Sequence, residues 1–158
     1  MSNKLDNGDQ LPEFSLNIGE SGTLNLPADI QTSYAIIIFY RGHWWPFCRR
    51  LLDAYQQRLD KFKALNTSII AASVDPLEKT EEVFGSLTFP VAWGVDRELG
   101  NKLGSFWEER RNFIQPTEFV VNNSGKILSS TYSSSPLGRT DPDEALVLLQ
   151  FLIKRDGG

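Results

Sequence analysis

The chain has 158 residues, of which 41% are hydrophobic and 23% are charged, the balance expected of a soluble globular protein. Its 16 basic and 20 acidic residues give a net charge of −4, which argues against nucleic acid as a main partner because phosphate binding needs a clustered basic surface. No stretch approaches the ~20 apolar residues of a membrane span, the N-terminus lacks a signal-peptide core, and a single cysteine cannot form an internal disulfide. We therefore expect one domain over residues 1–158 of a cytoplasmic protein with no membrane or nucleic-acid partner.

The first half of the chain predicts a strand, a helix and a second strand. Residues 34–40 are apolar at consecutive positions, as in a central strand covered on both faces. Residues 49–65 predict an amphipathic helix, whose apolar face carries Leu52, Tyr55, Leu59 and Phe62. Residues 68–74 predict the next strand, and a unit of this length implies a right-handed parallel crossover.

The second half predicts shorter elements. They are a helix over 77–84, a strand over 89–95, a helix capped by Asp96 and ending near Leu103, strands over 118–121 and 126–129, and a helix from Asp141 to about Lys154. Residues 122–125, Asn-Asn-Ser-Gly, indicate a hairpin because Asn and Gly tolerate positive φ. The last helix begins with Asp-Pro-Asp-Glu, a strong start signal.

The turn between the first strand and the first helix carries the most informative motif. Residues 39–48 read Phe-Tyr-Arg-Gly-His-Trp-Trp-Pro-Phe-Cys. Pro46 suits a first helical position, and Cys48 falls within the first helical turn. Reactive thiols favour this location because unsatisfied N–H groups and the helix dipole stabilise a thiolate.

This motif resembles the Phe-Tyr-Arg-Gly-Gly-Trp-Cys-Pro-Phe-Cys loop of the alkyl hydroperoxide reductase and thiol-specific antioxidant family, the peroxiredoxin-like proteins. Weaker likenesses at residues 8–16, 87–90, 115–117 and 132–139 extend the resemblance over roughly residues 8–154. It implies an α/β, thioredoxin-like fold, with a central mixed β-sheet flanked by helices and a peroxiredoxin-type insertion. A doubly wound flavodoxin-like sheet is the competitor, which the late hairpin argues against.

The resemblance also implies that a cysteine has been replaced. In the family the first cysteine of the motif attacks peroxide or disulfide and the second resolves the product, whereas this chain has Trp45 at the first position and keeps Cys48 at the second. Cys48 is either a buried structural thiol or a reactive one. Trp45 plugs a pocket, stacks on a ligand or packs at a subunit contact, while its neighbours Trp44 and Phe47 are ligand-binding candidates or core residues.

Other candidate residues follow from the same resemblance. Arg41 and Arg139 stand where the family places guanidinium groups around the substrate, with surface charges as the alternative. Pro116 is expected to follow a cis peptide bond in a turn that places Thr117 beside the 45–48 loop. His43 is the sole histidine, and we expect it to be exposed or hydrogen-bonded because a structural zinc site needs four ligands.

Two functions remain open. The first is a thiol-dependent antioxidant oxidoreductase acting on a peroxide or a thiol/disulfide substrate, with weak or absent activity because the nucleophile is missing. The second is a non-catalytic binding module of the same fold. We expect no cofactor and no metal, and we expect a homo-oligomer because an aromatic loop that admits no substrate still has apolar area to bury. The arginine doublets at 49–50 and 110–111 are interpreted as solvated faces.

Overall fold

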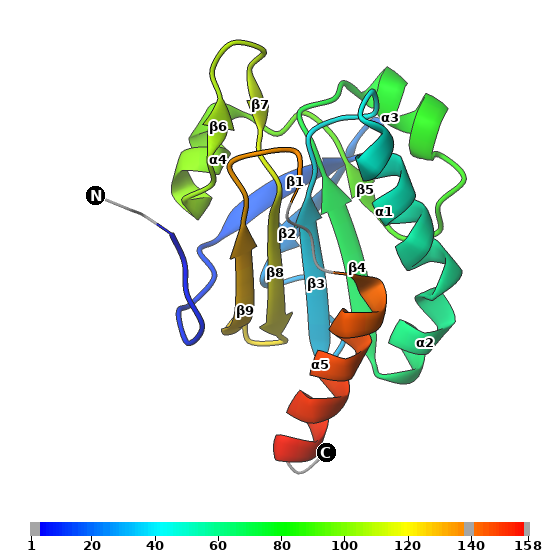
Figure 1. Ribbon diagram of the computed structural model, residues 1–158, viewed down its shortest axis with the longest axis vertical. Coiled ribbons are helices and arrows are strands. Elements are labelled where there is room, and N and C mark those ends of the chain that lie inside the picture. Colours follow the sequence, from blue (N-terminus) through cyan, green and yellow to red (C-terminus); the bar gives the residue numbers. More distant parts are fainter. Residues whose placement is uncertain (1–3, 138–140, 157–158) are drawn as a thin grey trace.

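The computed structural model describes residues 4–137 and 141–156, and its centre is a mixed five-stranded sheet (Figure 1). In spatial order the strands are β5 (Val91–Ala92), β4 (Thr67–Ala72), β3 (Tyr34–Phe39), β8 (Thr117–Asn122) and β9 (Ile127–Tyr132). β3, β4 and β5 run parallel, whereas β8 is antiparallel to both β3 and β9. The predicted late hairpin is therefore confirmed, and the flavodoxin-like alternative is excluded. The strand predicted over 89–95 is shorter, because only two of its residues pair with β4.

Both faces of the sheet are covered, which explains the continuous apolar run of β3. The helices are α1 (Pro46–Gln57), α2 (Leu59–Ala64), α3 (Leu77–Phe84), α4 (Arg97–Leu103) and α5 (Pro142–Arg155). Ile36 and Ile38 pack with α1, α2 and α5 on one face. Ile37 and Phe39 pack on the other with α4 and with a hairpin of β1 (Phe14–Ile18) and β2 (Gly22–Leu26). Alternate residues of a strand point to opposite faces, so β3 supplies both cores.

The helix predicted over 49–65 is divided at Arg58, which separates α1 from α2. Arg58 leaves the helical region with φ −108° and ψ 9°. Its side chain donates to the carbonyl oxygen of Ala54 at 3.0 Å and to the carboxylate of Asp143 at 2.7 Å. The break therefore ties the end of α1 to the first turn of α5.

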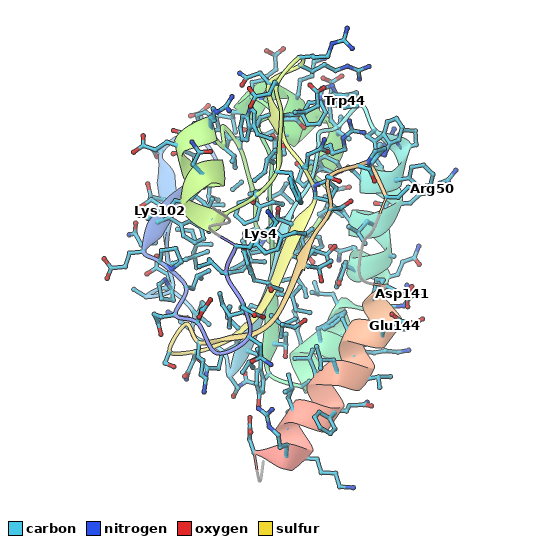
Figure 2. The ribbon with its side chains drawn as sticks, turned by 60° about the vertical axis from the view of Figure 1, so that its left-hand side comes forward. Lys4, Trp44, Arg50, Lys102, Asp141 and Glu144 are labelled. Atoms are coloured by element: carbon cyan, nitrogen blue, oxygen red, sulfur yellow. The ribbon has the colours of Figure 1, made fainter. Side chains whose placement is uncertain are left out.

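The start of α5 agrees with the sequence prediction. The carboxylate of Asp141 accepts hydrogen bonds from the backbone N–H groups of Asp143 at 3.0 Å and Glu144 at 3.3 Å, and Pro142 follows at the first helical position. Figure 2 shows Asp141 and Glu144 at this end of the helix. None of the helices in the described residues is long and apolar enough to cross a membrane.

Between β5 and β8 the chain inserts α4 and a small hairpin of β6 (Trp107–Glu108) and β7 (Phe113–Ile114). Asp96 caps α4 as predicted, accepting from the N–H of Leu99 at 2.9 Å. The hairpin packs closely on α4, since a Cβ added to Gly100 would lie 2.9 Å from the indole of Trp107. Arg97 on α4 is also ion-paired with Glu109 in the hairpin turn. These contacts fix the hairpin beside α4, above the start of β8 (Figure 1).

Candidate functional site

The candidate site is the loop from Tyr40 to Trp45, together with the first turn of α1. Backbone hydrogen bonds continue from the sheet into the loop, because the N–H of Tyr40 donates to the carbonyl oxygen of Ala72 at 3.0 Å. Trp45 is the N-cap of α1 and makes no side-chain capping bond, while Pro46 takes the first helical position as predicted. The N–H of Cys48 donates to the carbonyl oxygen of Trp45 at 3.0 Å.

Asp75 lies between β4 and α3, and its hydrogen bonds hold the Tyr40 to Trp45 loop in place. Its buried carboxylate accepts from the backbone N–H of His43 at 2.7 Å, and its second oxygen lies 3.0 Å from the Nδ1 atom of the His43 ring. His43 is thus hydrogen-bonded, one of the two outcomes expected for it. A side chain at Gly42 would crowd this packing, since a Cβ there would lie 2.5 Å from Nε1 of Trp44 and 3.1 Å from Asp75 Oδ1.

The side chain of Arg41, which belongs to the loop, lies among aromatic rings. Its guanidinium carbon is 4.5 Å from the ring centroid of Phe113, 5.1 Å from that of Trp45 and 5.4 Å from that of Trp44. Only 8% of Arg41 is exposed. Cation–π attraction is strongest at such a desolvated position, so these rings hold the charge in place. The alternative interpretation of Arg41 as a surface charge is therefore wrong.

Cys48, the only thiol of the chain, is fully buried at 0% exposure. It belongs to the core cluster between α1 and the sheet, together with Tyr40, Leu52 and Tyr55. The phenol of Tyr40 shows how apolar this region is, because burial raises the pKa of that hydroxyl well above its ordinary value. The burial of Cys48 agrees with the first of its two interpretations, while its reactivity stays untested.

The aromatic residues differ from one of the sequence interpretations. Trp44 and Phe47 are not core residues, since they are 38% and 41% exposed, whereas Trp45 is half-buried and packs against the core. The reason is the direction of α1, which turns Cys48 and Leu52 toward the sheet and leaves Phe47 outside. Trp45 contacts both neighbours, with ring centroids 6.0 Å from Trp44 and 5.7 Å from Phe47.

Thr117 is the first residue of β8, and its predicted place beside the 45–48 loop stays a prediction. Thr117 pairs with Phe39 in the sheet, is fully buried, and its hydroxyl group bonds Ser105 Oγ at 2.8 Å. The cis peptide expected before Pro116 was wrong. In the described residues the only cis peptide bond is Leu26–Pro27. The Gln115–Pro116 bond is trans, the form that X–Pro bonds favour, and in this form the carbonyl oxygen of Pro116 accepts a hydrogen bond from the N–H of Ser133 at 3.0 Å. Arg139 lies outside the described residues.

Two cavities lie at the candidate site. One of about 420 Å³ is lined by Arg41, Glu108, Arg110 and Arg111. The other, of about 500 Å³, is lined by His43, Trp44, Pro46, Arg49, Arg50, Asp53 and Val83. Both arginine doublets, interpreted from the sequence as solvated faces, therefore border the candidate site. One sequence signal could have indicated this position. Arg110 and Arg111 lie between the apolar residues Trp107 and Phe113, which belong to the two strands of the β6–β7 hairpin.

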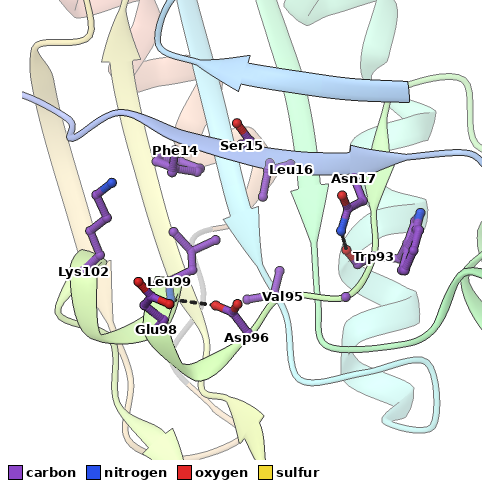
Figure 3. A pocket seen from close by; sticks show the side chains of 11 residues that line it. Phe14, Ser15, Leu16, Asn17, Trp93, Val95, Asp96, Glu98, Leu99 and Lys102 are labelled. Carbon is purple, nitrogen blue, oxygen red and sulfur yellow. Dashed lines mark hydrogen bonds between the residues drawn. The ribbon is translucent and has the colours of Figure 1, made fainter. Parts of the chain in front are cut away.

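A third cavity, of about 250 Å³, lies away from the loop between β1 and α4 (Figure 3). Its polar groups already serve the fold. Asp96 caps α4, Asn17 donates to the carbonyl oxygen of Trp93 at 3.4 Å, and Lys102 donates to the carbonyl oxygen of Glu13. Within the described part of the chain, no three or more His, Cys, Asp or Glu side chains gather in a group that could hold a metal ion.

Comparison with solved structures identifies the class of fold. Peroxidoxin BcpB from Mycobacterium tuberculosis superposes with a TM-score of 0.82 at 18% identity, covering 94% of this chain and 98% of that one. AhpC from Enterococcus faecalis superposes with a TM-score of 0.79 at 20% identity, covering 98% of this chain and 97% of that one. The fold is thus thioredoxin-like, as the sequence predicted.

Sequence comparison then gives the family. The AhpC/TSA family model matches residues 7–130, so the chain belongs to the AhpC/TSA family. A peroxiredoxin of Chlorobaculum tepidum is 27% identical over 153 residues, covering 92% of this chain and 71% of the relative. A peroxiredoxin of Methanococcus maripaludis is 29% identical over 161 residues, covering 96% and 73%.

Proposed function

We propose that this protein is a peroxiredoxin-like member of the antioxidant family in which peroxidase activity is weak or absent. The burial of Cys48 is the observation that carries the proposal, because the only thiol of the chain has no exposed surface for a peroxide to reach. By its resemblance to the family motif, the loop has Trp45 at the position of the attacking cysteine. Arg41 remains in place to polarise a substrate that no exposed sulfur can attack. The cytoplasmic location stays a prediction.

A non-catalytic binding module is the second candidate. It is supported by the exposure of Trp44 and Phe47 and by the two cavities at the site, one of which is lined by Trp44. A side chain that is apolar, large and exposed beside a cavity is suited to contact a ligand or a second protein surface. In this role Trp45 acts as a plug that packs on the core and supports Trp44.

The test is to restore the missing sulfur with Trp45→Cys. A thiolate at position 45 would attack one peroxide oxygen and break the O–O bond, giving a sulfenic acid and releasing water or an alcohol. Cys48 would then displace the hydroxyl as water to form a 45–48 disulfide, which two electrons from an added dithiol return to the two thiols. Arg41 lies close enough to favour the ionised sulfur. The variant should consume peroxide with turnover, whereas wild type should react slowly.

Trp44→Cys is the matched control, since it places a thiol on the same loop but outside the three-residue spacing to Cys48. It should not show the turnover of Trp45→Cys. The space left by the indole of Trp45 costs some stability, so folding is checked by circular dichroism. If wild type consumes peroxide as fast as Trp45→Cys, and Cys48→Ser removes that activity, then Cys48 is itself the nucleophile and the proposal is wrong.

A further inference from the structure

The cavity lined by Arg41, Glu108, Arg110 and Arg111 gathers three guanidinium groups and one carboxylate. This excess of positive charge is local, because the whole chain carries a net charge of −4. Arginine stays protonated at any physiological pH, so Arg110 and Arg111 place two adjacent like charges at the cavity, and these charges repel each other. An anion in the cavity would relieve that repulsion.

Other arginines of the described chain are used differently. Arg58, Arg97 and Arg155 each form an ion pair with a carboxylate. Within residues 4–137 and 141–156, neither Arg110 nor Arg111 forms an ion pair of this kind. The nearby carboxylate of Glu108 accepts from the backbone N–H of Arg111. The two guanidinium groups of the hairpin turn are therefore available to a ligand.

The cavity is built on ordered elements. The guanidinium carbons of Arg41 and Arg111 lie 5.4 Å and 5.7 Å from the ring centroid of Trp44, so one indole positions both charges. The turn that carries Arg110 and Arg111 is fixed by the Arg97–Glu109 ion pair and by a 2.9 Å hydrogen bond from Trp107 Nε1 to Asn112 Oδ1. Such an arrangement loses little side-chain freedom on binding.

We propose that this cavity binds a small organic oxyanion, with a carboxylate or phosphate head at the arginines and an aromatic group against the exposed ring of Trp44. Arginine presents a planar fork of N–H donors that matches two oxygens of such a head, and the lining contains no lysine. A cavity of about 420 Å³ is within the range of ligand sites. The inference goes beyond the proposed function and does not depend on whether the protein reduces peroxide.

Isothermal titration calorimetry at low salt tests this with benzoate and phenyl phosphate as probes, and with benzyl alcohol as the neutral comparison. Both anions should bind, more weakly as salt increases, and benzyl alcohol should not. Inorganic phosphate separates the two parts of the site, since its binding should be weaker than that of phenyl phosphate. Equal binding of benzyl alcohol and the anions, or of the two phosphates, would overturn the proposal.

Arg110→Gln and Arg111→Gln should each weaken anion binding about tenfold, the loss of one charge-assisted contact. Both side chains are exposed in the hairpin turn, so the variants should unfold at the wild-type temperature. Glu108→Gln should strengthen binding, because it removes the one negative charge of the lining. Arg50→Gln is the control, with the same charge change in the neighbouring cavity and no expected effect. Unchanged affinity in both hairpin variants, or loss only in Arg50→Gln, would show that the anion binds elsewhere.

Discussion

Asp75 orders a loop that lies far from it in the sequence. Its carboxylate is almost wholly buried and accepts a hydrogen bond from the backbone N–H of His43 at 2.7 Å. The backbone N–H of Asp75 donates to Ser73 Oγ at 3.1 Å, which fixes Asp75 in its own loop. A buried N–H without an acceptor carries the full cost of desolvation. The position of Trp44 and Trp45 therefore depends on a residue of another crossover.

Asp75→Ala should lower the free energy of unfolding by about 2 to 3 kcal/mol, the range for a buried charge-assisted hydrogen bond. His43→Ala is the matched control, because it keeps the backbone N–H bond to Asp75 and loses only the partly exposed ring. It should cost less than about 1 kcal/mol. Urea unfolding measures both values, and equal losses would show that the ring contact, not the backbone bond, holds the loop.

At the scale of single residues, the sequence predicted position better than environment. The spacing after Pro46 placed Cys48 in the first helical turn, and that is correct. It left open whether the thiol is buried, because this depends on which side of α1 faces the sheet. Arg110 and Arg111 are exposed, as interpreted, but their place beside Arg41 was missed, because the hairpin that carries them is formed by strands of only two residues.

At the scale of elements, strong local sequence signals were sufficient to predict a helix start or a turn, whereas weak signals were not. The Asp-Pro start of α5 and the Asn–Gly turn between β8 and β9 act within a few residues, and both were predicted. The β1–β2 hairpin was missed, although Phe14, Leu16 and Ile18 alternate with polar residues before Gly19. The break at Arg58 depends on Asp143, which lies 85 positions further on and cannot be found from helical periodicity.

Asp141→Ala should destabilise the protein by roughly 1 kcal/mol, the usual loss of a capping carboxylate. The motivation is the pair of hydrogen bonds that Asp141 accepts from the N–H groups of Asp143 and Glu144. The urea midpoint should fall accordingly, and Asp141→Asn should retain most of the stability because its amide oxygen still caps. A midpoint unchanged in Asp141→Ala would count against this cap.

The Arg58–Asp143 pair should make stability depend on pH. The hydrogen bond from Arg58 lowers the pKa of Asp143 below its ordinary value, so the unfolded chain takes up the proton first as the pH falls. The stabilisation is therefore present above about pH 4 and is lost on further acidification. Asp143→Asn should be less stable than wild type at pH 7 and equal to it near pH 2. Arg58→Gln should behave in the same way, and a difference that persists at pH 2 would assign the effect to packing.

At the scale of the whole molecule, exposed apolar side chains lead us to expect a dimer or a larger homo-oligomer. Phe47 in the first turn of α1 is exposed, and so are Val147 and Phe151, which lie one turn apart on α5. Sedimentation velocity at tens of micromolar should show a species larger than the 17.8 kDa chain. Phe47→Ser should dissociate it if the loop is the contact, and Phe151→Ser is the comparison for α5. A single species of 17.8 kDa in wild type would refute oligomerisation.

The close approach of Gly100 to Trp107 has a consequence for the evolution and redesign of this protein. Gly100 acts as a spacer of minimal thickness between α4 and the β6–β7 hairpin, because an added Cβ would meet the indole at 2.9 Å. A larger residue there would have to displace Trp107, and a shift of the hairpin with it would move the two arginines and change the width of the cavity without changing its lining. Position 100 on α4, which does not line the cavity, would in this way influence the size of the ligand that the cavity can bind.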